Sequence, residues 1–265
     1  MTNSADRPGN FPATQWRTRG VGDLSELAQA RVEAINLVQW LARIANSYVG
    51  ESEAELRTRL HFRSSDAAIV TRQFADCVAL EIRLPRLEMQ FLDDGKPVPH
   101  VFDPGERSPA EAEAWILVEL LHRGVDREKF SKQLPYTVPG LMSGDAEDYS
   151  PQLCKHGLVQ LTALFRDAAA ILSAAAPAAE ADKIRLICLP QRLELTTLSA
   201  PEGTLGEFAF SPGDAETPDP YFYVIAAARN RLAAGTTRPV LKASTLIAEG
   251  DPIAAADKLK TLARA

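Results

Sequence analysis

The feature that most constrains the fold is a change in hydrophobic period early in the chain. From Asp23 to Val49, apolar residues recur every three or four positions, which predicts a long amphipathic helix. From Glu55 to Leu92, apolar residues instead alternate with polar ones, which predicts short β-strands. Asp94-Gly95 is a turn sequence typical of hairpins. This segment therefore predicts an antiparallel meander with one buried face and one polar face.

The alternation assigns side chains to the two faces of that sheet. We expect the following residues to line the buried face: Leu56, Leu60, Phe62, Val78, Leu80, Ile82, Leu87, Met89 and Phe91. The opposite face of the first strand is basic, with Arg57, Arg59, His61 and Arg63. Such a row can hold a phosphate or carboxylate, but a solvated face balanced by acidic residues of neighbouring strands is the favoured interpretation.

The rest of the chain adds helices and a second group of strands. Ser108-Pro109-Ala110-Glu111 predicts a capped helix that ends at Gly124, and Ser150-Pro151 opens another helix. Strand-like patterns follow over 183–198, 207–210, 221–227 and 239–247, and Asp251-Pro252 starts a closing helix. No internal repeat occurs at a fixed spacing. The sequence therefore predicts an α+β fold, with antiparallel sheet clusters and segregated packed helices.

The length of 265 residues suits one large domain or two small ones. Residues 1–18 contain Pro, Gly and Asn and predict a flexible N-terminal lead-in. We expect residues 19–265 to form a single α+β domain, or two packed halves that meet near 134–150. The segment 134–144, rich in Pro and Gly, predicts an ordered loop or linker at that boundary.

Charge and cysteine usage bound the partners and the compartment. The chain has 29 Lys and Arg against 35 Asp and Glu, a net charge of −6 that disfavours bulk nucleic acid and anionic membranes. The N-terminus lacks the apolar segment of a signal peptide. Cys77, Cys154 and Cys188 are sparse and odd in number, which favours free thiols in a reducing compartment. We therefore expect a cytoplasmic protein with no nucleic-acid or membrane partner.

The sequence lacks the motifs of several common catalytic and binding sites. The chain has no P-loop, no H-E-x-x-H, no C-x-x-C and no G-x-S-x-G. None of the four histidines forms an i,i+4 pair, so we expect no metal ligands and no cofactor. Asp145, Glu147 and Asp148 precede a helix start, where carboxylates complement the helix dipole; the alternative is a hard-cation site.

The densest set of polar groups beside aromatic residues lies between 190 and 224. Arg192 and Glu194 are two positions apart on a predicted strand, as are Tyr221 and Tyr223, so each pair shares a face. Asp214 belongs to the turn between them. If the two strands are neighbours, these five residues converge on one concavity that binds an anionic or carbonyl-bearing ligand. The alternative is an Asp-stabilised turn with tyrosines at the edge of the core.

In this segment the chain resembles an uncharacterised family of bacterial proteins of unknown function. The matching stretches are Pro190 to Leu198, the Phe-Ser-Pro-Gly-Asp turn over Phe210 to Asp214, and the Pro-Tyr-Phe-Tyr-Val strand over Pro220 to Val224. The resemblance implies no established activity. Where the family has two histidines and an aspartate, this chain has Gln191, Arg192 and Glu194. If the family's pattern serves metal binding or acid–base chemistry, this chain has changed it, and Arg192 favours anion binding instead.

These observations favour a binding module for a small anionic or polar ligand or for a protein partner. The alternative is a metal-independent hydrolase or lyase, in which Glu194 or Asp214 is the base and Tyr221 or Tyr223 is the acid. A third interpretation is a purely structural subunit. The sequence names no catalytic residue and does not decide whether the protein is an enzyme.

Overall fold

The first half of the chain folds as a long helix followed by a five-stranded meander and a second helix. The computed structural model describes residues 23–50, 54–175, 186–197, 207–225 and 240–264, so the predicted lead-in over 1–18 lies outside the described residues. The elements of this half are α1 (Leu24–Tyr48), α2 (Ala54–Arg57), β1 (Leu60–Arg63), β2 (Ala68–Val70), β3 (Val78–Arg83), β4 (Glu88–Asp93), β5 (Lys96–Phe102) and α3 (Pro109–His122).

The helix boundaries follow the capping residues. The Asp23 side chain accepts hydrogen bonds from the first backbone N–H groups of α1, and Ser108 and Glu111 form a reciprocal capping box at the start of α3. Asp94 and Gly95 both have positive φ, as a two-residue hairpin between β4 and β5 requires. These predicted signals are confirmed.

The second half repeats this order of elements. It consists of α4 (Lys155–Ala175), β6 (Leu186–Leu189), β7 (Glu194–Thr197), β8 (Glu207–Ser211), β9 (Tyr221–Ile225), β10 (Val240–Lys242), α5 (Ala243–Ile247) and α6 (Pro252–Arg264). A 3₁₀ turn over Pro151–Cys154 leads into α4. The strand predicted over 239–247 splits into β10 and α5. The helix segment Pro151–Ala175 has the length and composition to cross a membrane, but most of it is buried within the fold.

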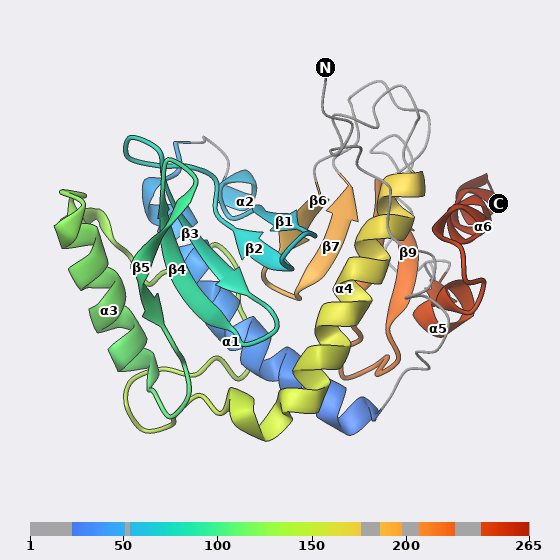
Figure 1. Ribbon diagram of the computed structural model, residues 1–265, viewed down its shortest axis with the longest axis horizontal. Coiled ribbons are helices and arrows are strands. Elements are labelled where there is room, and N and C mark those ends of the chain that lie inside the picture. Colours follow the sequence, from blue (N-terminus) through green and yellow to red (C-terminus); the bar gives the residue numbers. More distant parts are fainter. Residues whose placement is uncertain (1–22, 51–53, 176–185, 198–206, 226–239, 265) are drawn as a thin grey trace, which may run out of the picture.

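All ten described strands belong to one antiparallel sheet in the order β10-β9-β8-β7-β6-β1-β2-β3-β4-β5. Helix α3 flanks the β5 end, and α5 and α6 lie beyond β9 at the other end (Figure 1). The antiparallel sheet and its accompanying helices confirm the predicted α+β fold.

The pairing registers show that the two halves are structural repeats joined at β1 and β6. One row of opposed residues crosses the first meander, and its counterpart crosses the second. These rows are Phe62, Ile69, Ile82, Met89 and Phe102 in the first half, and Cys188, Leu195, Phe210, Phe222 and Leu241 in the second. His61 faces Ile187 at the junction. The sequence shows no repeat because equivalent positions share hydrophobicity but not identity.

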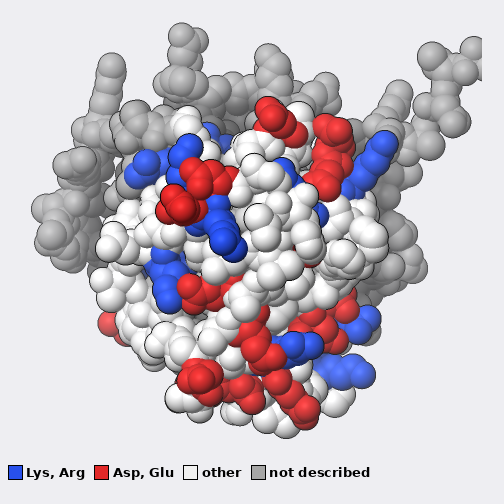
Figure 2. Space-filling view, turned by 90° about the vertical axis from the view of Figure 1, so that its left-hand side faces the viewer, with Lys and Arg blue, Asp and Glu red and all other residues white. Residues whose placement is uncertain are grey.

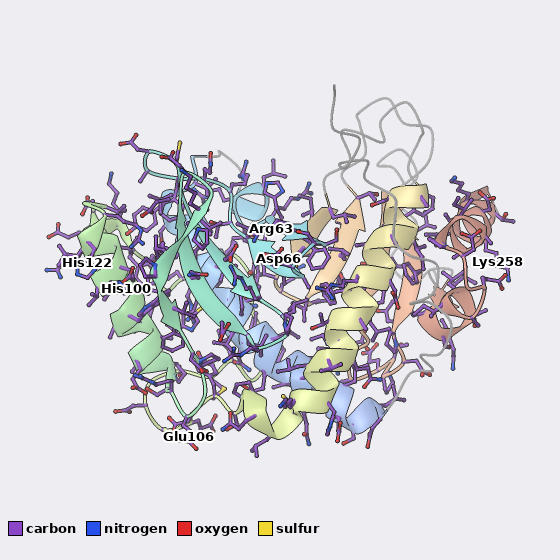
Figure 3. All side chains as sticks on the ribbon, viewed as in Figure 1. Arg63, Asp66, His100, Glu106, His122 and Lys258 are labelled. Atoms are coloured by element: carbon purple, nitrogen blue, oxygen red, sulfur yellow. The ribbon has the colours of Figure 1, made fainter. Side chains whose placement is uncertain are left out.

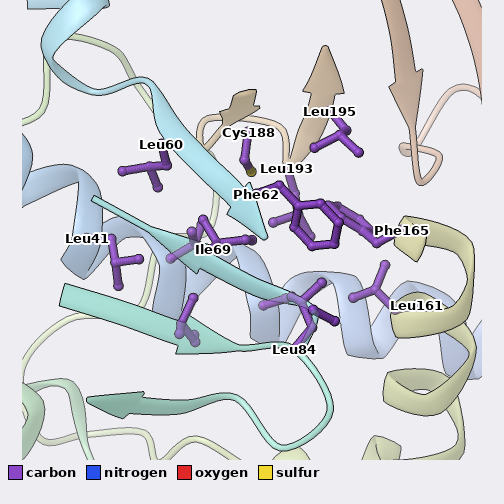
Figure 4. Packing of buried hydrophobic residues seen from close by; sticks show 14 of the residues in the cluster. Leu41, Leu60, Phe62, Ile69, Leu84, Leu161, Phe165, Cys188, Leu193 and Leu195 are labelled. Atoms are coloured by element: carbon purple, nitrogen blue, oxygen red, sulfur yellow. The ribbon is translucent and has the colours of Figure 1, made fainter. Parts of the chain in front are cut away.

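The core lies between this sheet and the long helices. Figure 4 shows Phe62 of β1 and Leu195 of β7 near Phe165 of α4, whereas Leu41 of α1 lies at the other side of the same cluster, near Leu60. Phe165 makes edge contacts with Phe62 and with Phe210, at ring-centroid distances of 5.4 and 5.7 Å. The core is therefore continuous across both halves.

The predicted buried face of the first meander is confirmed, with one exception. Its residues from Leu60 to Phe91 are buried, although Leu87 lies in the β3–β4 turn and not in a strand. Leu56 is the exception: it lies in α2 and is half-buried. The strand predicted from Glu55 therefore begins only at Leu60. Ala, Glu, Leu and Arg all have high helix propensity, and that preference prevails over the alternating pattern in this segment.

The segment between the halves is an irregular loop fixed to α1 by polar contacts. The Tyr136 hydroxyl donates to Oε1 of buried Gln39 at 3.0 Å, and the Met142 backbone N–H donates to Oδ1 of Asn36 at 2.8 Å. Trp40 Nε1 donates to the Tyr149 hydroxyl at 2.9 Å. The predicted ordered loop over 134–144 is confirmed, since these contacts satisfy buried polar groups of the helix.

Candidate functional site

The sheet register places the predicted site residues of β7 and β9 on one face. Thr196 faces Ala209 of β8, which in turn faces Tyr223 of β9, so these three residues share a face. Glu194 and Tyr221 lie two positions away from members of this row, on the same strands, and therefore share that face as well. The opposite face carries the core phenylalanines.

The condition for the predicted convergence is not met. Convergence required the strands bearing 192–194 and 221–223 to be neighbours, but β8 lies between β7 and β9, and Arg192 lies in the turn before β7. The separation between Glu194 and Tyr221 is therefore two strand spacings, or about 10 Å between backbones. Ser211 of β8 faces Tyr221 directly and becomes part of the site. Hydrophobic period cannot reveal such an intervening strand.

Arg192 and Glu194 form an ion pair at the β6–β7 turn. Arg192 Nη2 lies 2.9 Å from Glu194 Oε2; the glutamate side chain is only 2% exposed, whereas that of the arginine is 55% exposed. A buried carboxylate thus fixes one end of a solvent-facing guanidinium. Pro190 lies in this turn, so the expected break in the strand is a tight connection between β6 and β7.

Asp214 organises the β8–β9 connection and also contacts Tyr221. Its Oδ1 accepts backbone hydrogen bonds from Glu216 and Thr217 at 2.9 and 2.7 Å, and its Oδ2 accepts one from the Tyr221 hydroxyl at 3.1 Å. Gly213 has a φ of +95°, and a Cβ there would lie 2.4 Å from the Pro218 carbonyl oxygen. The Asp-stabilised turn is therefore present, and it positions the same carboxylate against the phenol.

The two tyrosines occupy different environments on this face. Tyr223 is 2% exposed and Tyr221 is half-buried, with ring centroids 5.8 Å apart. Burial raises the pKa of Tyr221; Asp214 and Glu194 raise it further, while a hydrogen bond with Ser211 acts in the opposite direction. Tyr221 therefore remains a protonated hydrogen-bond donor at neutral pH.

Sequence reasoning missed a residue of this cluster, Arg31 of α1. Its Nη1 donates to the Pro212 carbonyl oxygen at 3.5 Å. Burial lowers the pKa of Arg31, and the charges of Asp214 and Tyr221 oppose that effect. No local sequence pattern links 31 to 212, so this contact could be known only from the folded chain.

The contacts of Arg63 on the first strand favour the interpretation of a solvated face whose basic residues pair with acidic neighbours. Arg63 donates to both Asp66 oxygens at 2.8 and 2.6 Å and to Glu81 Oε2 at 2.6 Å, and Arg83 also binds Glu81. Figure 3 shows Arg63 and Asp66 side by side. Arg57 lies in α2, outside the predicted strand row. On the α3 and β5 side, acidic and basic side chains are interspersed (Figure 2).

A second cluster, which the sequence did not predict, lies at the end of α3. His100 of β5 and His122 of α3 lie near each other in Figure 3. The Glu119 carboxylate contacts both of them. His100 Nδ1 is 3.3 Å from Glu119 Oε1, and His122 Nδ1 is 3.7 Å from the same oxygen. The absence of i,i+4 histidine pairs therefore did not prevent two histidines from meeting. The signals that could have found them are the i,i+3 spacing of Glu119 and His122 and the packing of β5 on α3.

Comparisons with protein-family models, with curated proteins and with solved structures find no match for this chain. The resemblance to an uncharacterised bacterial family therefore stays a prediction, and the arrangement of side chains is the basis for the functional argument.

Proposed function

We propose that the protein is a binding module whose ligand contacts the cluster formed by Arg192, Glu194, Ser211, Asp214 and Tyr221. The observation that carries this proposal is the half-exposed guanidinium of Arg192, which buried Glu194 holds in place. A guanidinium has five N–H donors and stays charged, and the ion pair with Glu194 uses Nη2. Because the ion pair already orders this side chain, less conformational entropy is lost when a ligand binds to it.

The contacts of the two carboxylates, an ion pair and a set of hydrogen bonds, support binding rather than acid–base catalysis. Glu194 is paired with Arg192, and Asp214 accepts hydrogen bonds on both oxygens. A general base needs an oxygen directed at the substrate proton. The proposed hydrolase or lyase alternative therefore has less support from these contacts.

The ligand class follows from the groups that reach the surface. Arg192 favours a carboxylate or carbonyl oxygen, and the half-buried ring of Tyr221 offers an aromatic surface two strands away, on the face that carries Glu194. Arg192 balances the charge of Glu194, and Arg31 lies close enough to Asp214 to interact with its charge, so we propose a small polar ligand with a carboxylate that contacts Arg192. The acidic net charge of the chain supports a ligand of this kind over nucleic acid or an anionic membrane. The free cysteines support a reducing compartment such as the cytoplasm.

The test is a thermal-shift screen with a panel of small carboxylic acids, each paired with its uncharged amide. We expect at least one acid to raise the unfolding temperature of the wild-type protein more than its amide does, because a ligand that binds only the folded state stabilises it. In Arg192→Ala the shift should disappear while the fold remains. Arg86→Ala, which removes another solvent-exposed arginine that pairs with a glutamate, is the matched control. A panel without any stabilising acid, or a shift that persists in Arg192→Ala, would contradict the proposal.

A further inference from the structure

A distortion of the edge strand β5 directs His100 toward helix α3. The pairing of β4 with β5 shifts between Gln90 and Leu92, so that β5 contains extra residues at this point. The Gln90 side-chain amide donates to the Val98 carbonyl oxygen inside the distorted segment. His100 is two residues before Phe102, whose ring packs on Trp115 of α3 at 5.5 Å, and thus faces the same side. Such bulges often redirect a side chain at a functional site.

The second and third groups of the cluster come from the last turn of α3. Glu119 and His122 are three residues apart, which places them on neighbouring positions of one helix face. The Glu119 side chain is 4% exposed, whereas those of His100 and His122 are 66% and 57% exposed. The cluster therefore has a buried carboxylate at its base and two imidazoles that are open to solvent.

The distances within the cluster, which include a long hydrogen-bond contact between His100 Nδ1 and Glu119 Oε1, also fit metal coordination. The Glu119 Oε1 atom lies 3.3 and 3.7 Å from the Nδ1 atoms of His100 and His122, and one ligand atom of each residue lies within 4.8 Å of the others. Hydrogen bonds between nitrogen and oxygen usually measure about 2.7–3.2 Å. Zinc bonds of about 2.1 Å in a tetrahedral site place neighbouring ligand atoms about 3.4 Å apart. The observed spacing thus leaves room for an ion between the three side chains.

Arg123 orients the carboxylate of this cluster. Its Nη1 donates to Glu119 Oε2 at 2.8 Å, its Nε donates to Asp93 Oδ1 at 2.9 Å, and its guanidinium lies 4.5 Å from the centre of the Phe91 ring. One oxygen of Glu119 is therefore occupied, and the other is directed at the two imidazoles. Partners that hold a ligand carboxylate in this way are common around metal sites.

We propose that His100, Glu119 and His122 bind a divalent transition-metal ion, with Zn²⁺ as the best-matched ion. Two imidazoles and one carboxylate are a ligand set used by zinc, and three protein ligands leave a fourth position for water. An octahedral ion would need neighbouring ligand atoms closer together, at about 3.0 Å, than those found here. The bound ion links the edge strand β5 to the end of α3. This proposal replaces the sequence-based expectation of no metal ligands and is independent of the proposed ligand site on β7–β9.

Zinc titration followed by calorimetry tests the site. The protein carries no histidine tag, is first treated with a chelator, and contains Cys77→Ser because Cys77 is an exposed free thiol. We expect about one Zn²⁺ per chain and a weakening of affinity by at least about tenfold in His100→Ala and in His122→Ala. Both side chains are largely exposed, so each variant should remain folded, which circular dichroism verifies.

The matched control is His156→Ala, because His156 is an exposed histidine on another helix, α4, with 89% of its side chain accessible. Its affinity for Zn²⁺ should equal that of the parent protein. Substitution of Co²⁺ for Zn²⁺ provides a second readout, since tetrahedral Co²⁺ absorbs visible light much more strongly than the hydrated ion. No stoichiometric Zn²⁺ binding, unchanged affinity in His100→Ala and His122→Ala, or an equal loss in His156→Ala would each overturn the proposal.

Discussion

At the scale of single residues, Asp66 shows how an ion pair links stability to pH. Arg63 holds its carboxylate in a two-pronged contact, and this contact above all lowers the pKa of Asp66. The folded state therefore binds the Asp66 proton less readily than the unfolded state does. Its stabilising contribution is present above the unfolded pKa of about 4 and is lost as the pH falls through the lower folded value.

We accordingly predict that Asp66→Asn reduces the acid sensitivity of the protein. The free energy of unfolding, measured with urea at a series of pH values, should fall less steeply below about pH 5 in the variant. Both partners are more than one-third exposed, so solvent screening limits the difference to about 1 kcal/mol or less. Asp145→Asn is the control, because it removes one carboxylate from an exposed acidic loop away from Arg63. A parallel pH profile for Asp66→Asn and the wild type would contradict the prediction.

Phe62 provides a second test at this scale, because it lies where the two halves meet. Its side chain is 6% exposed and packs edge-on against Phe165 of α4. Phe62→Ala should lower the free energy of unfolding by roughly 3–5 kcal/mol, since it removes buried apolar area and leaves a cavity. Val101→Ala, at an exposed position of the edge strand, should change it by less than about 0.5 kcal/mol. A loss below about 1 kcal/mol for Phe62→Ala would show that the register of β1 is wrong.

At the scale of elements, the close crossing of α1 and α4 depends on Gly157. A Cβ at this position would lie 2.1 Å from the Glu26 carbonyl oxygen and 3.0 Å from the Ala30 Cβ. Alanine is favoured over glycine in a helix by about 1 kcal/mol, but the clash is with backbone, which cannot rotate away. The two helices would have to move apart to accept the methyl group.

Gly157→Ala should therefore lower the free energy of unfolding by about 2 kcal/mol or more, despite the gain in helix propensity. Urea unfolding measures the difference. Gly50→Ala is the matched control, because a Cβ at Gly50 meets no atom within 4 Å. We expect that control to leave stability unchanged or slightly increased. A neutral Gly157→Ala variant would mean that the helices are farther apart than described.

The helices, strands and turns also differ in how well the sequence predicts them. The strands of the first meander, the capped helix α3 and the hairpin at Asp94-Gly95 follow from local period and turn chemistry. The turns before β2 and β7 do not, because Ala67 and Leu193 adopt positive φ values of 54° and 55° without a glycine to signal them. Tertiary packing determines these turns, since both side chains are fully buried.

The same distinction applies to the candidate sites. Tyr221 and Tyr223 could be predicted to share a face, because they are two positions apart on a strand. The strand pattern does not explain the contact of Arg192 with Glu194, because Arg192 lies in the turn before β7 begins at Glu194. The order of strands could not be predicted, so the intervening β8 and the contribution of Arg31 were missed. The His100, Glu119 and His122 cluster depends on packing between β5 and α3, and a search along the sequence for paired histidines does not detect it.

At the scale of the whole molecule, the two halves share one hydrophobic core. Leu27, Leu41, Phe62 and Ile82 of the first half belong to the same buried cluster as Phe165, Leu195, Phe210 and Leu259 of the second. A buried polar contact also joins the halves, since Gln39 Nε2 of α1 donates to the Pro190 carbonyl oxygen at 2.8 Å. Neither half could leave the other without exposing this shared surface to water.

We therefore predict that the two halves unfold together. Chains of this length often populate intermediates, and a repeat of two independent units would give two thermal transitions. A shared core instead couples the halves, so differential scanning calorimetry should show one transition whose calorimetric and van't Hoff enthalpies agree. Phe165→Ala should shift that single transition to lower temperature without splitting it, because Phe165 contacts both β1 and β8. Two resolved transitions in the wild-type protein would show that the β1–β6 junction and the crossing of α1 and α4 contribute little to holding the halves together.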